Sequence, residues 1–309
     1  MKVLVAGATG ALGRPLVRQL VERGHEVFGI TRSKSKAEVI RSLGAKLVVA
    51  DALDPEAVAL AVTESEPEVI VHQATALSGS VDVRHFDRSL AMTNRLRTEA
   101  TDHLLAAGRA VGIKRFVAQS FAGWPFARTG GPVKSEGDPL DPAPPQGMRG
   151  ALEAIRHLEA AVTTADWTTG IVLRYGGFYG PGTTLAPEGE HIELIRKRGF
   201  PVVGGGSGVW SFIHVEDAAE ATVAAVEHGS AGIYNVVDDE PAPVAEWLPA
   251  VAESVGAKPP RRVPRWLGRL LAGEVATVMM TEVRGASNEK AKRELGWRPG
   301  RPSRREDLA

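Results

Sequence analysis

The sequence predicts an α/β fold: a doubly wound parallel-sheet Rossmann domain with a smaller C-terminal substrate lobe. Short apolar segments alternate with amphipathic helical segments over the first 175 residues. A glycine-rich turn joins the first of these strands to the first helix, and after Arg174 the alternation gives way to Gly- and Pro-rich sequence. Because crossovers between parallel strands are right-handed, helices should cover both faces of one sheet.

The predicted strands are short apolar runs bounded by polar or glycine residues. They cover 2–6, 25–31, 46–50, 69–73, 115–119, 170–174, 212–214 and 232–237. The predicted helices cover 12–23, 33–43, 55–63, 87–111, 151–164, 244–255, 264–272 and 289–295. We assign 1–175 and 211–237 to the dinucleotide-binding domain and 176–210 and 238–309 to the substrate lobe. Segments 126–147 and 204–208 are expected to be mobile loops over a cleft.

Composition excludes several classes of site and partner. The 37 basic and 37 acidic residues balance, so no overall field attracts nucleic acid. The absence of cysteine excludes disulfides and thiolate chemistry. No apolar run is long enough to span a bilayer, and the first strand leaves no room for a signal peptide. We therefore expect a cytoplasmic protein that acts on a small molecule, with no membrane or nucleic-acid partner.

The turn after the first strand carries Gly7, Gly10 and Gly13 with the spacing of a dinucleotide fingerprint. The first glycine permits a tight turn, the second lets the backbone approach a diphosphate, and the third lets the helix pack on the strand. The helix N-terminus would then face the anion. The residues predicted to form this phosphate loop are Gly7, Thr9, Gly10, Ala11, Leu12 and Gly13.

Residues after the second strand favour NADP over NAD, although NAD remains possible. Arg32 and Ser33 stand where a carboxylate would hold the ribose of NAD, and no carboxylate occurs before Glu38. A guanidinium can bind the 2′-phosphate of NADP, whereas a carboxylate would repel it. Lys36 is a looser contact. A solvated basic loop is the alternative interpretation.

Four residues that end later strands are expected to line the same cofactor. Asp51 and Ala52 follow the third strand, where the carboxylate can accept from the adenine amino group. Gln73 and Ala74 end the fourth strand, next to the point where the strand order should reverse.

These motifs resemble the extended short-chain dehydrogenase/reductase family, of the NAD(P)-dependent epimerase/dehydratase type. The resemblance rests on the glycine loop, Asp51, Asn94 and the segments 115–120, 173–182, 212–219 and 288–297. It implies a nicotinamide cofactor, a C-terminal substrate lobe and a homodimer formed through two long helices. It also places four residues beside the cofactor: Asn94, Tyr175, Gly177 and Phe178.

The family's proton relay, a Tyr followed four residues later by a Lys, is missing. The three tyrosines, Tyr175, Tyr179 and Tyr234, are followed at that distance by Tyr, Thr and Asp. Counting back from Tyr179 puts Arg149 and Glu153 at the relay positions. Anchoring on Glu159 puts Ala151 and Ile155 there, and the sequence leaves both registers open.

Other residues are candidates for catalysis. Ser120 ends the fifth strand and is either a donor to a substrate oxygen or a cap for the loop. Tyr179 is either a substitute acid or structural, and Arg149 with Glu153 is either an acid/base pair or a surface ion pair. No His, Asp or Glu cluster has metal-ligand spacing, so we expect no metal.

Three functions follow from these motifs. The favoured one is an NAD(P)-dependent oxidoreductase, epimerase or dehydratase acting on a small hydroxyl- or carbonyl-bearing substrate without the standard relay. The others are a non-catalytic protein that senses NADP(H), and a lyase or isomerase that uses other acid/base residues.

Overall fold

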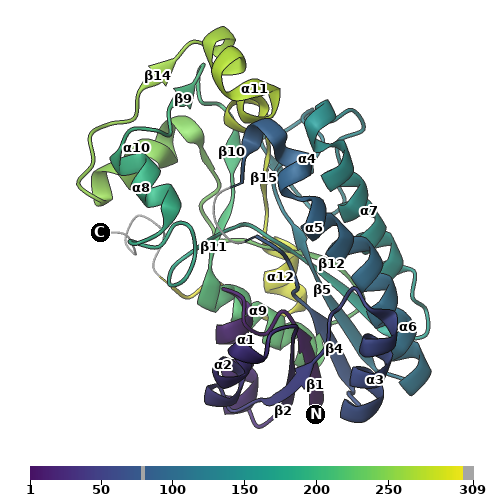
Figure 1. The fold of residues 1–309 in the computed structure, drawn as a ribbon. Coiled ribbons are helices and arrows are strands. Elements are labelled where there is room, and N and C mark those ends of the chain that lie inside the picture. The colour runs from purple at the N-terminus through teal and green to yellow at the C-terminus, as the bar shows by residue number, and fades with distance from the viewer. Residues whose placement is uncertain (78–80, 302–309) are drawn as a thin grey trace.

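The computed structural model describes residues 1–77 and 81–301, and it contains a seven-stranded parallel sheet of order β12-β7-β5-β4-β1-β2-β3 (Figure 1). The order reverses between β1 and β4, as in a doubly wound Rossmann fold, so the predicted fold class is confirmed. The strands are β1 (Lys2–Ala6), β2 (Glu26–Thr31), β3 (Lys46–Val49), β4 (Val69–His72), β5 (Arg115–Phe121), β7 (Thr169–Tyr175) and β12 (Gly232–Val236).

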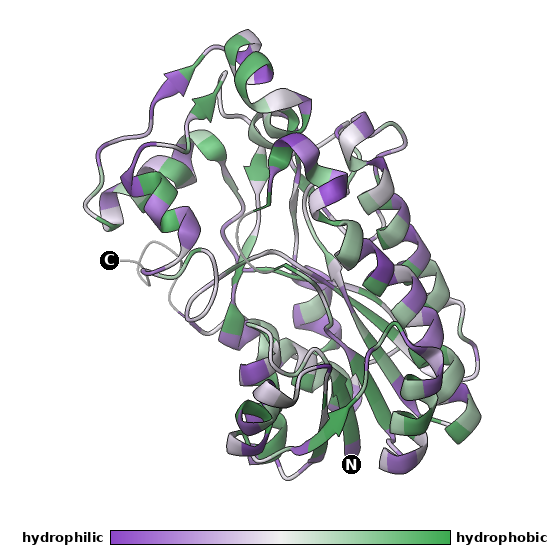
Figure 2. Cartoon of the chain, in the orientation of Figure 1, coloured by the Kyte–Doolittle hydropathy of each residue, from purple (hydrophilic) through white to green (hydrophobic). Residues whose placement is uncertain are grey.

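Helices cover both faces of this sheet (Figure 1). One face carries α1 (Gly13–Glu22), α2 (Ala37–Ser42), α9 (Val215–His228) and α12 (Glu289–Glu294), and the other carries α3 (Pro55–Ser65), α6 (Thr101–Val111) and α7 (Arg149–Thr163). Within β1, Val3 and Val5 join the first core, whereas Leu4 and Ala6 join the second. The strands are therefore apolar on both sides, which Figure 2 shows as nearly continuous green.

The prediction of one continuous helix over 87–111 is wrong. The structure divides it into α4 (Phe86–Ser89), α5 (Ala91–Arg95), the π-helical turn η3 (Leu96–Ala100) and α6. At η3 the Leu96 carbonyl accepts a hydrogen bond from His72 Nε2 at 2.9 Å. A carbonyl with a partner outside the helix is a common reason for a widened turn.

The C-terminal lobe contains α8 (Glu190–Arg196), α10 (Val244–Ser254) and α11 (Arg265–Thr281). The helix predicted to end at residue 272 continues as α11 beyond a break at Gly273, where φ is 89°. Trp247 is the centre of an aromatic cluster with Phe200, Trp210 and Phe212. Four two-stranded sheets connect the segments: β8 (Gly177–Tyr179) with β11 (Phe212–His214), β9 (Val202–Val203) with β14 (Arg262–Val263), β10 (Val209–Trp210) with β13 (Ala242–Pro243), and β6 (Val133–Lys134) with β15 (Gly285–Ala286).

Segment 126–147, expected to be a mobile loop, is tied to the rest of the chain. Arg128 binds Asp141 at 2.8 Å and Glu282 at 2.6 Å, and β6 within the segment pairs with β15.

Three short 3₁₀ turns complete the described elements: η1 (Lys34–Lys36), η2 (Val83–His85) and η4 (Gln146–Met148). No helix among the described residues is both long and apolar enough to cross a membrane.

The buried imidazole of His72 predicts an acid-sensitive stability. Burial lowers the pKa of His72 to about 4, whereas an unfolded histidine takes up a proton near pH 6.5. Between these values the unfolded chain binds the extra proton, so the stabilisation present at neutral pH is lost as the pH falls. The native chain should lose about 2 kcal/mol more unfolding free energy than His72→Gln between pH 7.5 and 5 in urea titrations. Parallel curves for the two proteins would contradict this assignment.

Candidate cofactor and active site

The glycine turn between β1 and α1 is shaped by close backbone contacts. Gly7 has a φ of 94°, and a Cβ there would lie 2.6 Å from the Gln73 carbonyl carbon. A Cβ on Gly13 would lie 2.1 Å from the Gly7 carbonyl oxygen, so the helix approaches the strand end more closely than any side chain permits. Gly10 and Ala11 are exposed, Thr9 is half-buried, and Leu12 is buried beneath them.

Helix α1 begins at this turn without a side-chain cap and without an acidic residue in its first turn. Backbone N–H groups at such a start, together with the helix dipole, favour an anion. The Thr9 carbonyl accepts from Arg14 Nε at 3.2 Å, which holds the loop against the helix. The turn therefore fits the diphosphate of a dinucleotide.

The residues predicted for the adenosine half lie at the ends of β2 and β3. Arg32 is exposed directly after β2, and the Ser33 N–H donates to Thr31 Oγ1 at 3.2 Å. Asp51 Oδ1 accepts from the Leu53 N–H at 3.0 Å, which fixes the turn after β3. Ala52 and Ala74 pack in one small apolar cluster with Leu53, Leu96 and Ala100.

The residues predicted for the other half lie at the ends of β4 and β7. Gln73 Nε2 donates to the Tyr175 hydroxyl at 3.2 Å, and that hydroxyl lies 2.6 Å from Thr222 Oγ1. Burial raises the pKa of Tyr175, so its phenol stays protonated at neutral pH. The Phe178 ring, next to Gly177 in β8, packs 5.5 Å from the Tyr175 ring.

Asn94 lies near the end of α5, one residue before the last residue of that helix and two before the π-helical turn. Its Oδ1 is buried and has no hydrogen-bond partner among the described residues. The cofactor-contact prediction for Asn94 stays a prediction, and an unpaired amide oxygen of this kind suits a ligand donor.

Ser120 belongs to a buried polar network instead of ending free at the sheet edge. Its hydroxyl donates to Glu159 Oε1 at 2.7 Å. The same carboxylate accepts from Arg174 Nε at 2.7 Å and Nη2 at 2.6 Å, a two-pronged ion pair between α7 and β7. Ser120 and Arg174 are neighbours on β5 and β7, and all three side chains are buried.

The ion pair between Glu159 and Arg174 favours one of the two registers in which the relay positions can be aligned. Glu159 binds the arginine of segment 173–182, so α7 is anchored through the acidic residue that the second register uses. In that register Ala151 and Ile155 occupy the relay positions, and both are fully buried. The buried side of α7 therefore presents a methyl and an aliphatic chain where the family has a phenol and an ammonium.

Arg149 and Glu153, the relay candidates of the first register, are both exposed on α7. The neighbouring exposed residues Arg156 and His157 are polar too, so apolar burial would add little to a dimer through this helix. The homodimer and the acid/base role of Arg149 and Glu153 both stay predictions.

Tyr179 lies in the core of the C-terminal lobe. Its ring is 1% exposed and meets the His214 ring edge-on at 5.3 Å. His214 Nδ1 accepts from the Glu216 N–H at 3.1 Å and so caps α9. A tyrosine in this position packs the lobe, and its proposed role as a substitute acid remains untested.

Sequence reasoning missed Arg97 and gave no role to Arg174. Arg97 lies in η3, one helical turn from Asn94, with 6% of its side chain exposed. The sequence signal that could have identified Arg97 is its position three residues after Asn94, because residues at this spacing lie on the same face of a helix.

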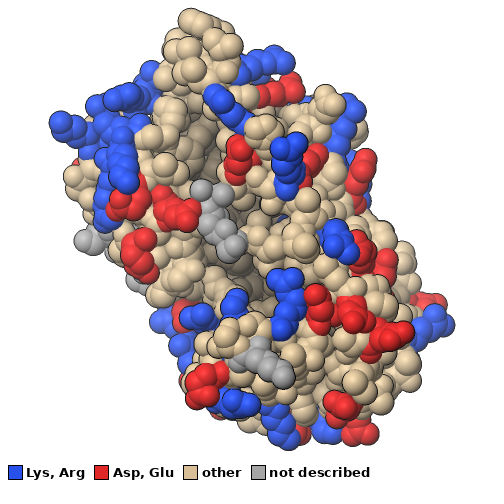
Figure 3. All heavy atoms as spheres, viewed as in Figure 1, with Lys and Arg blue, Asp and Glu red and all other residues tan. Residues whose placement is uncertain are grey.

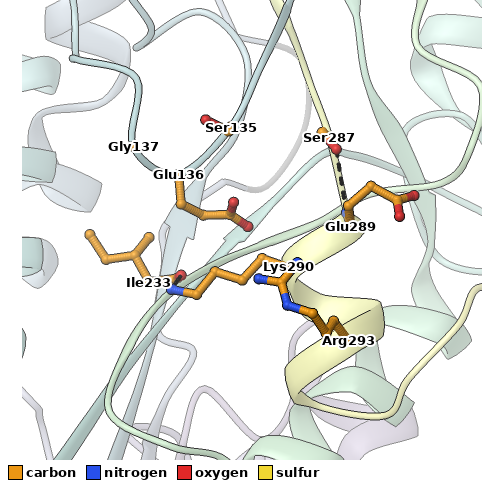
Figure 4. Close-up of a pocket in the computed structure, with 8 residues that line it drawn as sticks. All are labelled: Ser135, Glu136, Gly137, Ile233, Ser287, Glu289, Lys290 and Arg293. Atoms are coloured by element: carbon orange, nitrogen blue, oxygen red, sulfur yellow. Dashed lines mark hydrogen bonds between the residues drawn. The ribbon is translucent and has the colours of Figure 1, made fainter.

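A pocket of about 510 Å³ lies away from this site, against the free edge of β12 (Figure 4). Glu136 Oε1 accepts from the Asn235 N–H at 2.7 Å, and Lys290 Nζ donates to the Ile233 carbonyl at 2.8 Å. Lys290 also lies 4.5 Å above the Tyr234 ring. Glu136 and Lys290 form hydrogen bonds with backbone groups of the edge strand β12. We therefore assign the pocket a structural role.

The surface is hollowed between the C-terminal lobe and the sheet domain on the face seen in Figure 3. Among residues 1–77 and 81–301, no group of three His, Asp or Glu side chains is placed to hold a metal ion.

The NAD dependent epimerase/dehydratase family model matches residues 3–237. The chain belongs to this family. The predicted resemblance of this chain to the extended short-chain dehydrogenase/reductases is thereby confirmed. The chain is an oxidoreductase of the epimerase/dehydratase type.

Individual relatives show how widely the family varies. The chain is 47% identical to a Streptomyces protein named 3-diazoavenalumate denitrifying reductase, over 100% of this chain and 99% of that one. It is 28% identical to a UDP-glucose 4-epimerase of Mycolicibacterium smegmatis, over 97% and 94% of the two chains. The UDP-glucose 4-epimerase of Thermus thermophilus, solved in complex with NAD, is 27% identical, with a TM-score of 0.74 over 100% of this chain and 99% of that chain.

The phosphate loop is testable through Gly13→Ala. Its new Cβ must displace the Gly7 carbonyl, so affinity for NAD(P)H should fall at least roughly tenfold in calorimetric titrations. Gly205→Ala is the matched control, because nothing lies within 4 Å of a Cβ at that position. Equal affinity of both variants would place the cofactor elsewhere.

Proposed function

We propose that this protein is an NADPH-dependent reductase that removes the nitrogen of an aromatic diazo substrate by hydride transfer. The observation that carries the proposal is the buried side of α7, where Ala151 and Ile155 replace a proton relay in the register anchored by Glu159. This substrate class differs from the hydroxyl- or carbonyl-bearing class expected from the family.

Reduction of a carbonyl creates an alkoxide, which needs a proton donor in the transition state. Reductive loss of dinitrogen does not. The substrate carbon gains a hydride and forms a C–H bond, while the electron pair of its C–N bond leaves with N₂. For an aryl diazonium the charges balance without any proton, so aliphatic groups at 151 and 155 are compatible with turnover.

The bound nicotinamide nucleotide supplies the hydride. The chain's own residues would hold its diphosphate at the glycine turn and its other half near Gln73, Tyr175 and Phe178, which contact one another. The hydroxyls of Tyr175 and Ser120 already form hydrogen bonds within the protein, so the proposal needs neither as a proton donor. The 47% identity to a reductase with a diazo substrate in its name supports the same chemistry.

NADP is the cofactor we propose, because Arg32 stands exposed after β2 with Ser33 and Lys36 and no carboxylate nearby in the chain. Arg32→Ala should weaken NADPH binding by about 1.5 kcal/mol or more, roughly tenfold, and leave NADH binding unchanged. Arg41→Ala, an exposed arginine on α2, should change neither affinity. Equal losses for NADPH and NADH would reject the Arg32 assignment.

The reaction is tested with 3-diazo-4-hydroxybenzoate as a simple aromatic diazo probe. NADPH is deuterated at C4 on one face or the other in two separate assays, and in one of the two the product should carry one deuterium at the former diazo carbon. Gas analysis with ¹⁵N-labelled probe should detect N₂ in a one-to-one ratio to NADPH consumed.

Controls without protein and with Gly13→Ala correct for chemical reduction of the probe. Deuterium that comes only from D₂O solvent would overturn hydride transfer. Consumption of NADPH with ketones but never with the diazo probe would restore the carbonyl substrate class.

A further inference from the structure

Arg97 carries a positive charge in the interior, and no carboxylate among residues 1–77 and 81–301 forms a hydrogen bond with it. Its Nε and Nη1 are buried and bind no acceptor among the described residues. Burial lowers the pKa of Arg97 to about 10, so the guanidinium remains charged at neutral pH. A buried charge without hydrogen-bonded partners is costly unless a ligand or another group pairs with it.

The charges around Arg97 do not cancel. Glu159 attracts it, but the same carboxylate is already bound at both oxygens by Arg174. Two guanidiniums thus share one carboxylate. His72, whose pKa lies at about 4, adds no charge at neutral pH. The network formed by Arg97, Arg174 and Glu159 therefore has a net charge of one positive unit.

The strand order places this charge on the nicotinamide side of the sheet. The glycine turn lies at β1, and Arg32 and Asp51 follow β2 and β3, on one side of it. A dinucleotide that spans the reversal point must extend its other half over β4, β5 and β7. Hydrogen bonds of Ser120, Arg174 and Glu159 connect β5, β7 and α7, and Arg97 of η3 interacts with Glu159 through its charge.

We infer that Arg97 makes the site select the reduced over the oxidised nicotinamide nucleotide. This inference rests on the proposed cofactor. NADPH and NADP⁺ have the same phosphates and riboses, but only the oxidised nicotinamide ring is positive. A net positive charge beneath this half of the site therefore disfavours the oxidised form alone. The charge therefore favours binding of NADPH and speeds the release of NADP⁺ after hydride transfer. A reductase benefits from both effects.

The test is the ratio of the dissociation constants for NADP⁺ and NADPH, measured by calorimetry without substrate. The native chain should prefer NADPH. Arg97→Met, which keeps most of the side-chain length without its charge, should reduce this preference roughly tenfold. Arg97→Lys should keep most of it.

A second variant should change the preference for NADPH in the opposite direction. Glu159→Gln leaves the network with one more positive unit, so the preference for NADPH should increase. A merely structural role would weaken both nucleotides together in every variant. Thermal melts identify any variant that fails to fold, and the remaining variants still decide the sign.

The outcomes separate the two hypotheses. An unchanged ratio in folded Arg97→Met, or a change of the same sign in Glu159→Gln, overturns the role of Arg97 and leaves the proposed function intact. Failure of the native chain to bind either nucleotide overturns the proposed function, and this inference with it.

Discussion

The carboxylate of Glu159 holds three elements in one register. It receives two hydrogen bonds from Arg174 on β7 and one from Ser120 on β5, while its own backbone belongs to α7. Removing one partner of a buried ion pair of this kind typically costs about 3–5 kcal/mol, because the other charge is left unpaired. The pair therefore fixes which residues of α7 face the sheet and which face solvent.

That register has a chemical consequence. Ala151 and Ile155 are enclosed, whereas Arg149 and Glu153 face outward, so α7 brings no titratable group to the relay positions of the second register. Instead, the polar groups near the carboxyl ends of β4, β5 and β7 bind one another, as Gln73 binds Tyr175 and Ser120 binds Glu159. Under the proposed function, this arrangement would orient a hydride donor and would not exchange protons with the substrate. The inferred preference for the reduced nucleotide would add the effect of the buried charge of Arg97 to that arrangement.

Local patterns were sufficient for much of the fold. Apolar runs located the seven strands of the main sheet to within two residues at either end, because strands buried on both faces are apolar at nearly every position. The glycine spacing predicted the tight turn between β1 and α1, since Gly7 and Gly13 occupy places where a Cβ would strike backbone atoms. The break of the long helix at η3 was not predictable, because it depends on His72, a residue distant in the chain whose imidazole meets the Leu96 carbonyl only in the folded sheet.

The sequence by itself determined the absence of a Tyr-Lys relay, the glycine fingerprint and the alternation that builds a doubly wound sheet, since each is a matter of residue identity and spacing. Only the tertiary structure showed that Ala151 and Ile155 are buried whereas Arg149 and Glu153 are exposed, and it gave Ser120 a buried partner. It also revealed Arg97 as a buried charge without a hydrogen-bonded counterion in the part of the chain that the structure describes. These features depend on contacts between residues from separate strands and helices, and one-dimensional spacing cannot say which of two neighbouring carboxylates on a helix will meet an arginine on a strand.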